Sequence, residues 1–311
     1  MYAGIKIIDS HAHFPVKESP MEHLVSKEKK AEIDRMQKNR KVSKAQMQWR
    51  NAWNFAKPDK KEYTDKELAD MWVEELDKYG IDKIIWVTGG GNERLSQIVN
   101  YAPDRFIGYA HYNLFADDAA EKLEKAITEQ GLKGYKLLAP VLDKPIADKS
   151  AYPVWEVCQK YNIPVLIHFG ILGAGGGIAY NENISPKVLE PVAKDFPDVN
   201  FIIPHFGCGH PKDLLFLGWV AENVYVDTSG SNQWMRWMPY EVTIKSSFQK
   251  FYETFGPERI IFGTDSSYFP RGFAVEYLHE QNKVLRFMNL PDKEVELIMS
   301  GNISRLLKLE D

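Results

Sequence analysis

Short apolar runs recur along the chain, and most of them are followed by a segment with the signals of a helix. The runs are continuous stretches of β-forming residues rather than alternating apolar and polar positions, which is typical of strands buried on both faces. They occupy residues 4–11, 83–88, 106–112, 132–139, 163–170, 199–207, 223–230 and 259–266. The pattern therefore predicts eight parallel strands that alternate with helices.

The segment before the second apolar run shows the helix signals most clearly. Thr64 and Glu67 have the spacing of a capping box, in which two side chains satisfy free backbone N–H groups at a helix start. Three apolar residues fall on one face of this helix, Leu68, Trp72 and Leu76. Gly80 follows them and is typical of a helix end.

Eight strands alternating with helices predict a closed TIM barrel, the (β/α)₈ fold. The rival fold is a doubly wound open sheet, but the turn after the first run, IIDSHAHFP, lacks the GxGxxG motif of that fold. A chain of 311 residues suits one large α/β barrel or two average domains. We therefore expect a single barrel domain over residues 1–311.

Residues 17–66 interrupt this alternation directly after the first strand. They hold 14 Lys and Arg against 8 Asp and Glu, a local charge of +6, which leaves −10 for the rest of the chain. The segment is predicted to be helical, either as a solvated element packed by its apolar face or as a cap over the active site. The interpretation as a cap rests on its position, because an insertion here lies on the catalytic face of a barrel. The segment can be a solvated, packed element and a cap at the same time.

Composition and charge exclude several classes of protein. With 44% hydrophobic residues and a net charge of −4, the chain is not disordered. A pI of about 6.1 without a basic tail gives no indication of a nucleic-acid partner. Cys158 and Cys208 form no CxxC pair, and the sequence shows neither a signal-peptide pattern nor a run of transmembrane length. We expect a soluble cytoplasmic protein with no membrane partner.

Histidine and aspartate side chains stand where several predicted strands end. His11 and His13 are two residues apart in the first strand and can face the same side, where paired imidazoles are good metal ligands. His168, His205 and Asp265 each follow an apolar run directly, at the end where barrel enzymes place catalytic groups. A lone histidine there is more often a hydrogen-bonded structural residue, but the coincidence at several strand ends favours a divalent ion with an open coordination position.

These motifs resemble the amidohydrolase superfamily, and more narrowly the amidohydrolase-related group that includes aminocarboxymuconate-semialdehyde decarboxylase and several lactonases. The phrases that carry the resemblance are IIDSHAHF, VLIHFG, IIPHFGCGHP, IIFGTDSSYFP and IMSGNISRLLKL, from residue 4 to about 309. The resemblance implies a distorted barrel with one or two metal ions. We expect a divalent ion, zinc first and manganese next. His11, His13, His168 and Asp265 match the metal positions, and His205 matches either a second-metal ligand or a catalytic acid/base.

Lys136, at the end of the fourth predicted strand, can have any of three roles. It can reach solvent or pair with a carboxylate as a structural residue. By the resemblance, it can be carboxylated and bridge two ions together with His168 and His205. As an ammonium it can also hold a substrate carboxylate. The narrower group is mostly mononuclear, which favours one ion.

Three further features receive weaker predictions. Trp234 and Arg236 follow the seventh strand and either line the pocket, with Arg236 suited to a carboxylate, or belong to core or interface. The glycine run 173–177 reads as a mobile loop near the site. His111 also ends an apolar run but matches no ligand position.

The first functional hypothesis is a metal-dependent hydrolase of a small anionic lactone, cyclic amide or ester, in which a metal-activated water attacks and Asp265 or His205 moves the proton. The alternative is a metal-dependent non-oxidative decarboxylase of a small carboxylic acid. A scaffold protein with a structural metal is disfavoured, because such sites are local and cysteine-rich whereas these ligands span positions 11 to 265. The resemblance and the aromatic content are also compatible with a homodimer.

Overall fold

A computed structural model describes residues 4–38, 44–52, 55–172 and 181–309 of the chain. The glycine run 173–177, predicted above as a loop, lies outside the described residues. So do residues 39–43 and 53–54 of the inserted segment.

Every apolar run coincides with a strand over at least part of its length. The strands are β1 (Ile8–His13), β2 (Lys83–Thr88), β3 (Phe106–Gly108), β4 (Ala110–His111), β5 (Tyr135–Leu138), β6 (Val165–His168), β7 (Phe201–Ile203), β8 (Val224–Asp227) and β9 (Ile260–Ile261). The third run holds both β3 and β4, which only Tyr109 separates. These two strands therefore act as one barrel position.

Helices follow most of the strands. They are α1 (Met21–Leu24), α2 (Lys27–Lys38), α3 (Lys44–Ala52), α4 (Asp65–Tyr79), α5 (Asn92–Val99), α6 (Ala119–Thr128), α7 (Tyr152–Tyr161), α8 (Glu190–Asp195), α9 (Pro211–Val220), α10 (Ile244–Phe255), α11 (Val275–Phe287), α12 (Asp292–Glu296) and α13 (Asn302–Leu307). Within the described ranges, no helix has the length and apolar content needed to cross a membrane.

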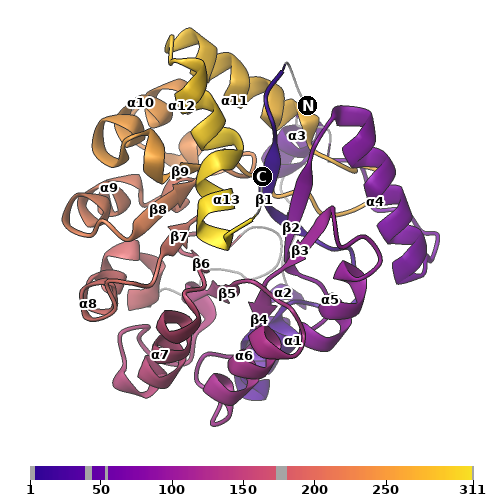
Figure 1. Cartoon of the computed structure of the whole chain (residues 1–311), viewed down its shortest axis with the longest axis vertical. Helices are drawn as coiled ribbons and strands as arrows, with labels where there is room; N and C mark the ends of the chain where they lie inside the picture. Colours follow the sequence, from indigo (N-terminus) through magenta and orange to yellow (C-terminus); the bar gives the residue numbers. More distant parts are fainter. Residues whose placement is uncertain (1–3, 39–43, 53–54, 173–180, 310–311) are drawn as a thin grey trace.

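The strands form a closed ring. All neighbouring pairs are parallel, in the orders β1-β2-β3 and β4-β5-β6-β7-β8-β9. The ring closes between its first and last members, where Ala12 bridges to Ser266 and the Asp265 N–H donates to the His11 carbonyl oxygen at 2.8 Å. The (β/α)₈ barrel is thus confirmed, with helices around the ring and α13 across one end (Figure 1).

Helix α4 begins and ends where its sequence predicts. The Thr64 side chain accepts from the Glu67 N–H, and the Glu67 carboxylate accepts from the Thr64 N–H. Gly80 ends the helix with a φ of 67°, a left-handed conformation that glycine adopts without strain. The three residues predicted for its inner face, Leu68, Trp72 and Leu76, are buried.

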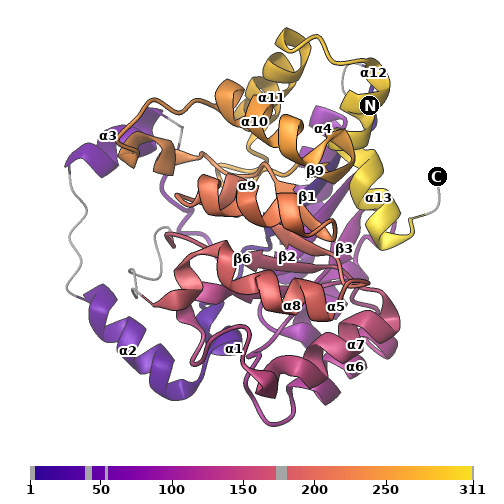
Figure 2. The same ribbon diagram turned by 90° about the vertical axis from the view of Figure 1, so that its left-hand side faces the viewer.

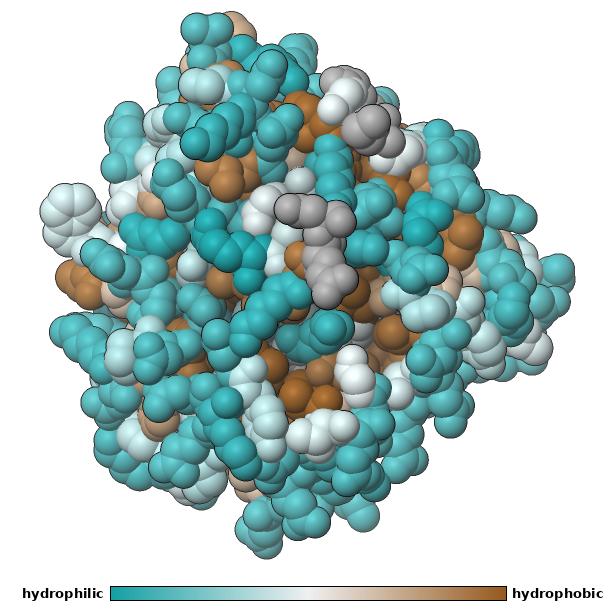
Figure 3. Space-filling view, in the orientation of Figure 1, coloured by the Kyte–Doolittle hydropathy of each residue, from teal (hydrophilic) through white to brown (hydrophobic). Residues whose placement is uncertain are grey.

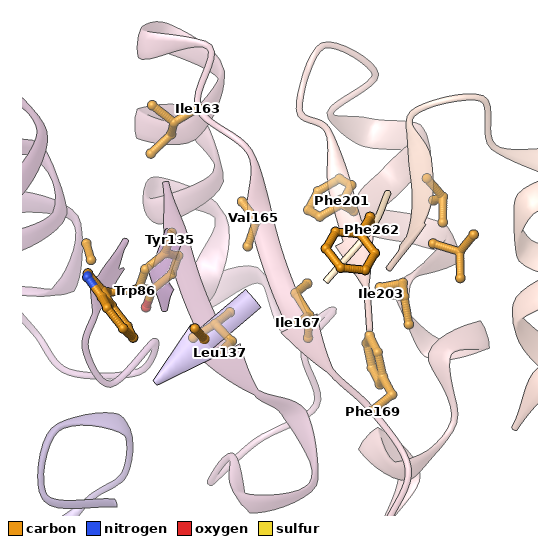
Figure 4. Packing of buried hydrophobic residues seen from close by; sticks show 14 of the residues in the cluster. Trp86, Tyr135, Leu137, Ile163, Val165, Ile167, Phe169, Phe201, Ile203 and Phe262 are labelled. Carbon is orange, nitrogen blue, oxygen red and sulfur yellow. The ribbon is translucent and has the colours of Figure 1, made fainter. Parts of the chain in front are cut away.

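Successive residues of each strand point to opposite faces, and the two sets of side chains form two separate apolar layers. Val165, Ile167 and Ile203 point outward and pack beneath the helices (Figure 4). Leu166 and its counterparts on neighbouring strands point inward, where α13 covers them. This inner cluster comprises Ile8, Ile85, Val87, Ile107, Tyr109, Leu166, Ile202, Tyr225, Ile261, Ile303, Leu306 and Leu307. One end of the barrel is therefore an apolar plug, which we call the closed end; the other end is the mouth.

The inserted segment lies on the mouth side. In Figure 2, α1, α2 and α3 are on the opposite side of the barrel from α13. Leu24 and Ile33 of this segment pack with Val141 and Leu172, which follow β5 and β6. This is the position expected of a cap, and the role of cap stays a prediction.

Candidate metal centre

Strand β1 places His11 at the centre of the mouth. Its Nδ1 donates to the Asp227 carboxylate at 2.7 Å, which leaves Nε2 unprotonated. Nε2 is buried and has no hydrogen-bond partner within the described residues. Burial, together with the charge of Lys136, lowers the pKa of His11 well below 6.5. The imidazole is therefore held neutral with a free electron pair, the form that binds a metal.

Asp227 contacts His11 from behind, a pairing that the sequence analysis did not predict. It ends β8, it is fully buried, and its second oxygen accepts from the Ser229 N–H at 2.6 Å. A carboxylate behind a ligating histidine fixes the tautomer and direction of the ring. The signal was available, because Asp227 ends an apolar run in NVYVDTSG just as Asp265 does in RIIFGTDS.

Asp265 and His13 meet at the seam where the ring closes. Asp265 Oδ1 lies 3.2 Å from His13 Nε2 and 4.0 Å from His11 Nε2. The His13 ring is oriented by Thr88 Oγ1, 2.7 Å from Nδ1, a partner that the sequence did not suggest. Burial acts to raise the Asp265 pKa, but the hydrogen bond with His13 and the neighbouring His205 outweigh it and hold the pKa well below 3.8. Asp265 is therefore a carboxylate.

His205 joins this group from the opposite side of the barrel. One donor atom each of His11, His205 and Asp265 lies within 4.8 Å of the others. His205 Nδ1 is 3.0 Å from the Ser229 carbonyl oxygen, so Nε2 is the nitrogen left free. His205 and Asp265 have φ values of 59° and 60°, a left-handed conformation that is unfavourable for such residues and concentrates at functional sites.

His168 and Lys136 complete the polar interior of the mouth. The His168 ring lies 5.0 Å from the His205 ring, and its Nε2 is 3.3 Å from the Ile171 carbonyl oxygen. Lys136 is fully buried, and its Nζ has no hydrogen bond or ion pair within the described residues. Burial lowers the pKa of Lys136 to about 8, although Asp265 and Asp227 act in the opposite direction. A buried cationic group without a partner is costly unless a ligand compensates it.

Three other predicted residues lie outside this group. Trp234 is buried, and its indole N–H donates to the His205 carbonyl oxygen at 3.0 Å, so it supports the His205 backbone. Arg236 is exposed. The substrate-binding roles suggested for both stay predictions. His111 is a buried structural histidine, because its Nε2 accepts from the Gly91 N–H at 3.0 Å.

Comparison with known proteins places the chain in a family. The family described as amidohydrolase matches residues 8–309 of the sequence. The chain belongs to the amidohydrolase family. The resemblance inferred from the strand-end motifs is thereby confirmed, and the protein is an enzyme of the amidohydrolase superfamily.

The proteins to which this amidohydrolase is similar are named for two kinds of reaction, decarboxylation and hydrolysis. A 2-amino-3-carboxymuconate-6-semialdehyde decarboxylase from Dictyostelium discoideum is 32% identical over 78 residues, 25% of this chain but only 22% of that relative's length. A 5-carboxyvanillate decarboxylase from Novosphingobium aromaticivorans DSM 12444, complexed with manganese and a nitrobenzoic acid, is 14% identical with a TM-score of 0.63 over 98% of this chain and 97% of its own. A probable 2-pyrone-4,6-dicarboxylic acid hydrolase from Acinetobacter baumannii is 16% identical, with a TM-score of 0.60. The match covers 98% of this chain and 100% of that protein's chain. At these identities, the two structures show a shared fold.

The donor groups of this amidohydrolase fit a divalent ion. The family is metal-dependent. One nitrogen each of His11 and His205 and an oxygen of Asp265 lie within 4.8 Å of one another, and His11 Nε2 has no hydrogen-bond partner within the described residues. Imidazole nitrogens suit zinc and similar transition metals, and a carboxylate oxygen is also accepted by zinc and manganese. The three residues whose donor atoms lie within 4.8 Å of one another include His205 and not His168, which the motif predicts as a ligand.

Proposed function

We propose that this amidohydrolase is a metal-dependent, non-oxidative decarboxylase that acts on a small carboxylic acid. The observation that carries the proposal is the Lys136 amine, which is fully buried beside the His/Asp group and has no ion-pair partner within the described residues. A substrate carboxylate would supply the missing negative charge. Two decarboxylases among the relatives support this choice, and it reverses the order of the two reactions expected from the motifs alone.

His11, His13, His168 and Asp265 are the residues that we propose to hold the ion, with zinc or manganese as the metal. The ion would supply positive charge where negative charge develops in the transition state. Asp227 and Thr88 would hold the two histidines of β1 in place through the bonds at their Nδ1 atoms. The chain's own part in metal binding is therefore to keep these nitrogens unprotonated and correctly aimed.

His205 is the residue that we propose to deliver the proton. In the reaction the bond between the substrate carbon and its carboxylate breaks, carbon dioxide leaves, and the electron pair stays on that carbon. The carbon then takes one proton. Since Ser229 fixes His205 Nδ1, the protonated Nε2 would face the substrate as a general acid.

The decisive experiment assays metal-loaded protein against aromatic and enoic carboxylic acids in D₂O, and follows carbon dioxide together with the product by NMR. We expect metal-dependent carbon dioxide release and one deuterium on the carbon that carried the carboxylate. His205→Asn should bind metal and release carbon dioxide at least about a hundredfold more slowly. Acid release from lactones or cyclic amides, with no carbon dioxide from any acid, would contradict the proposal.

Lys136 has two alternative roles in this site. Either its ammonium binds the substrate carboxylate, or the amine is carboxylated and joins His168 and His205 at a second ion. Metal analysis and NMR in the presence of ¹³C-bicarbonate separate these roles. One equivalent of metal without a carbamate signal supports the first role, whereas two equivalents with a carbamate signal that is lost in Lys136→Met support the second.

Hydrolysis of a small anionic lactone, cyclic amide or ester is the second candidate. It is favoured by the 2-pyrone-4,6-dicarboxylic acid hydrolase among the structural neighbours. The Asp265 side chain is ionised, because its pKa is held below its usual range, so its carboxylate can accept a proton from an attacking water. Lactone turnover that is lost in Asp265→Asn, without any carbon dioxide release, would put this candidate first.

A further inference from the structure

The segment after β9 carries an arginine that forms no ion pair within the described residues. This residue, Arg271, follows Asp265 by six positions, and its terminal nitrogen Nη2 is buried without a hydrogen-bond partner among those residues. The carboxylate of Glu75 is close by but accepts from the Lys78 ammonium at 2.9 Å and from the Phe273 N–H at 3.1 Å. A buried guanidinium nitrogen without an acceptor is costly unless a ligand supplies one.

Two aromatic rings hold the Arg271 guanidinium in place. Its Cζ lies 4.1 Å from the centre of the Phe55 ring and 5.1 Å from the centre of the Tyr277 ring. Aromatic faces attract a cation, but they offer no lone pair that could accept its N–H groups. The rings therefore position the guanidinium and leave Nη2 available. A planar fork of this kind is suited to a carboxylate, which can accept two parallel N–H bonds.

The inserted segment is attached to the loop that carries Arg271. The Tyr268 hydroxyl donates to the Ala56 carbonyl oxygen at 2.8 Å, and the Asp59 N–H donates to the Phe269 carbonyl oxygen at 2.9 Å. The inserted segment is on the opposite side of the barrel from α13 (Figure 2). Arg271 therefore lies on the mouth side, whereas α13 covers the other end, where the surface is mainly hydrophilic (Figure 3).

Tyr277 links Arg271 to the metal centre. Burial raises the pKa of Tyr277 to about 12, and the Asp265 charge contributes to this increase. Arg271 and Ser231 lower the same pKa, so both are neighbours of the Tyr277 hydroxyl. Ser231 in turn follows Gly230, where an added Cβ would lie 3.6 Å from Asp265 Oδ2. The guanidinium is therefore close to the groups that we propose to hold the ion.

We propose that Arg271 binds a second carboxylate of the substrate, one that the reaction leaves on the product. This inference rests on the proposed function, because it takes the carboxylate at Lys136 as the one that is released as carbon dioxide. Arg271 then selects a small diacid and orients it, since two charged side chains fix two points of the molecule. The inserted segment takes part in this selection through Phe55.

The first test measures binding and needs no turnover. Calorimetry with zinc-loaded protein compares isophthalate with benzoate and glutarate with butyrate, so that the two members of each pair differ by one carboxylate. The natural protein should prefer the diacids, and Arg271→Met should weaken their binding by about tenfold to a hundredfold while the monoacids stay within about twofold. Arg286→Met, at an exposed arginine of α11 that pairs with Asp292, is the matched control and should keep the preference.

Two further variants separate recognition from folding. Arg271→Lys keeps the charge without the planar fork and should restore the diacid preference only in part. Phe55→Ala removes one ring and should weaken diacid binding by about threefold to tenfold. Thermal unfolding and metal content should be unchanged in all variants. A natural protein without a diacid preference, or an equal loss for both members of a pair in Arg271→Met, would overturn the proposal, because an equal loss is what a structural role produces.

Turnover then distinguishes this proposal from the proposed function. If both hold, Arg271→Met raises KM for a diacid and changes kcat much less, because the second carboxylate is bound alike in the ground state and the transition state. A diacid preference that Arg271→Met abolishes, without carbon dioxide release from any acid, would support the role of Arg271 and refute the decarboxylase. Carbon dioxide release from diacids with the same KM in Arg271→Met would refute the role of Arg271 and retain the decarboxylase.

Discussion

The two ends of the barrel interior are built by the same strands, but one end stabilises the fold and the other holds the polar groups of the candidate metal centre. On β6, Leu166 points into the closed end beneath α13, and two residues later His168 points into the mouth. At the closed end, burial removes apolar surface from water and stabilises the fold. At the mouth, the same degree of burial removes Lys136 and the Nε2 of His11 from water without giving either a hydrogen-bond partner among the residues that the structure describes. The barrel therefore gains stability at one end and holds reactive groups at the other.

The strongest test removes both histidines of β1. His11→Ala with His13→Ala should lose the bound metal and reduce turnover by about a thousandfold or more, equivalent to at least about 4 kcal/mol in the transition state. Elemental analysis and a turnover assay measure both effects. His210→Ala is the control, because His210 contacts Asp213 outside the group and should keep its metal. Metal retained in full by the double variant would refute the ligand assignment.

The closed end should respond in stability alone. Ile303→Ala leaves a cavity between α13 and the strands and should reduce the free energy of unfolding by about 3 kcal/mol, as expected for a large buried aliphatic residue. The metal bound per folded chain should not change. Ser304→Ala on the same helix is the control, with an expected effect within about 0.5 kcal/mol. Urea unfolding measures both variants, and a loss of metal in Ile303→Ala would break the division between the two ends.

His111 tests whether any residue at the mouth also contributes to stability. Burial lowers its pKa from 6.5 to about 4, so the folded protein binds this proton less readily than the unfolded chain. Its contribution is therefore present above pH 6.5 and is lost as the pH falls toward 4, by about 3 kcal/mol in total. His111→Gln should make the decline of unfolding free energy over this interval shallower. Parallel curves for the two proteins would contradict this assignment.

Asp227 should have the smallest effect of the four. Asp227→Asn removes the charge behind His11 Nδ1 and should weaken metal binding by about tenfold to a hundredfold, as other carboxylates behind ligating histidines do. Competition with a chelator measures this change. Asp70→Asn, on the exposed face of α4, is the control and should bind metal normally. An unchanged affinity in Asp227→Asn would mean that the backbone alone orients His11.

The strands and the mouth residues could be predicted because each depends on a local pattern. An apolar run marks a buried strand, and a polar residue at its end marks the mouth, which is why His11, His168, His205 and Asp265 were all found. Helix α4 was predictable for the same reason, since its capping box lies within four residues.

Contacts across the barrel could not be predicted in this way. The hydrogen bond between His11 and Asp227 joins residues 216 positions apart, and the one between His13 and Thr88 joins residues 75 apart. Their pairing depends on closure of the ring, which fixes distances that no local spacing contains. Trp234 and Arg236 lie in a 3₁₀ helix at Gln233–Trp237, which buries Trp234 behind His205 and leaves Arg236 exposed.

The seam between β1 and the segment after β9 has a consequence for how the enzyme is made. The N–H of Asp265 reaches the carbonyl of His11, so the first and last of the proposed ligands become neighbours only when the ring closes. A chain still emerging from the ribosome presents its two N-terminal histidines long before the carboxylate that completes their site. With the ligands proposed above, a complete site exists only after Asp265 has been synthesised and the ring has closed, so the ion would be bound at a late stage of folding.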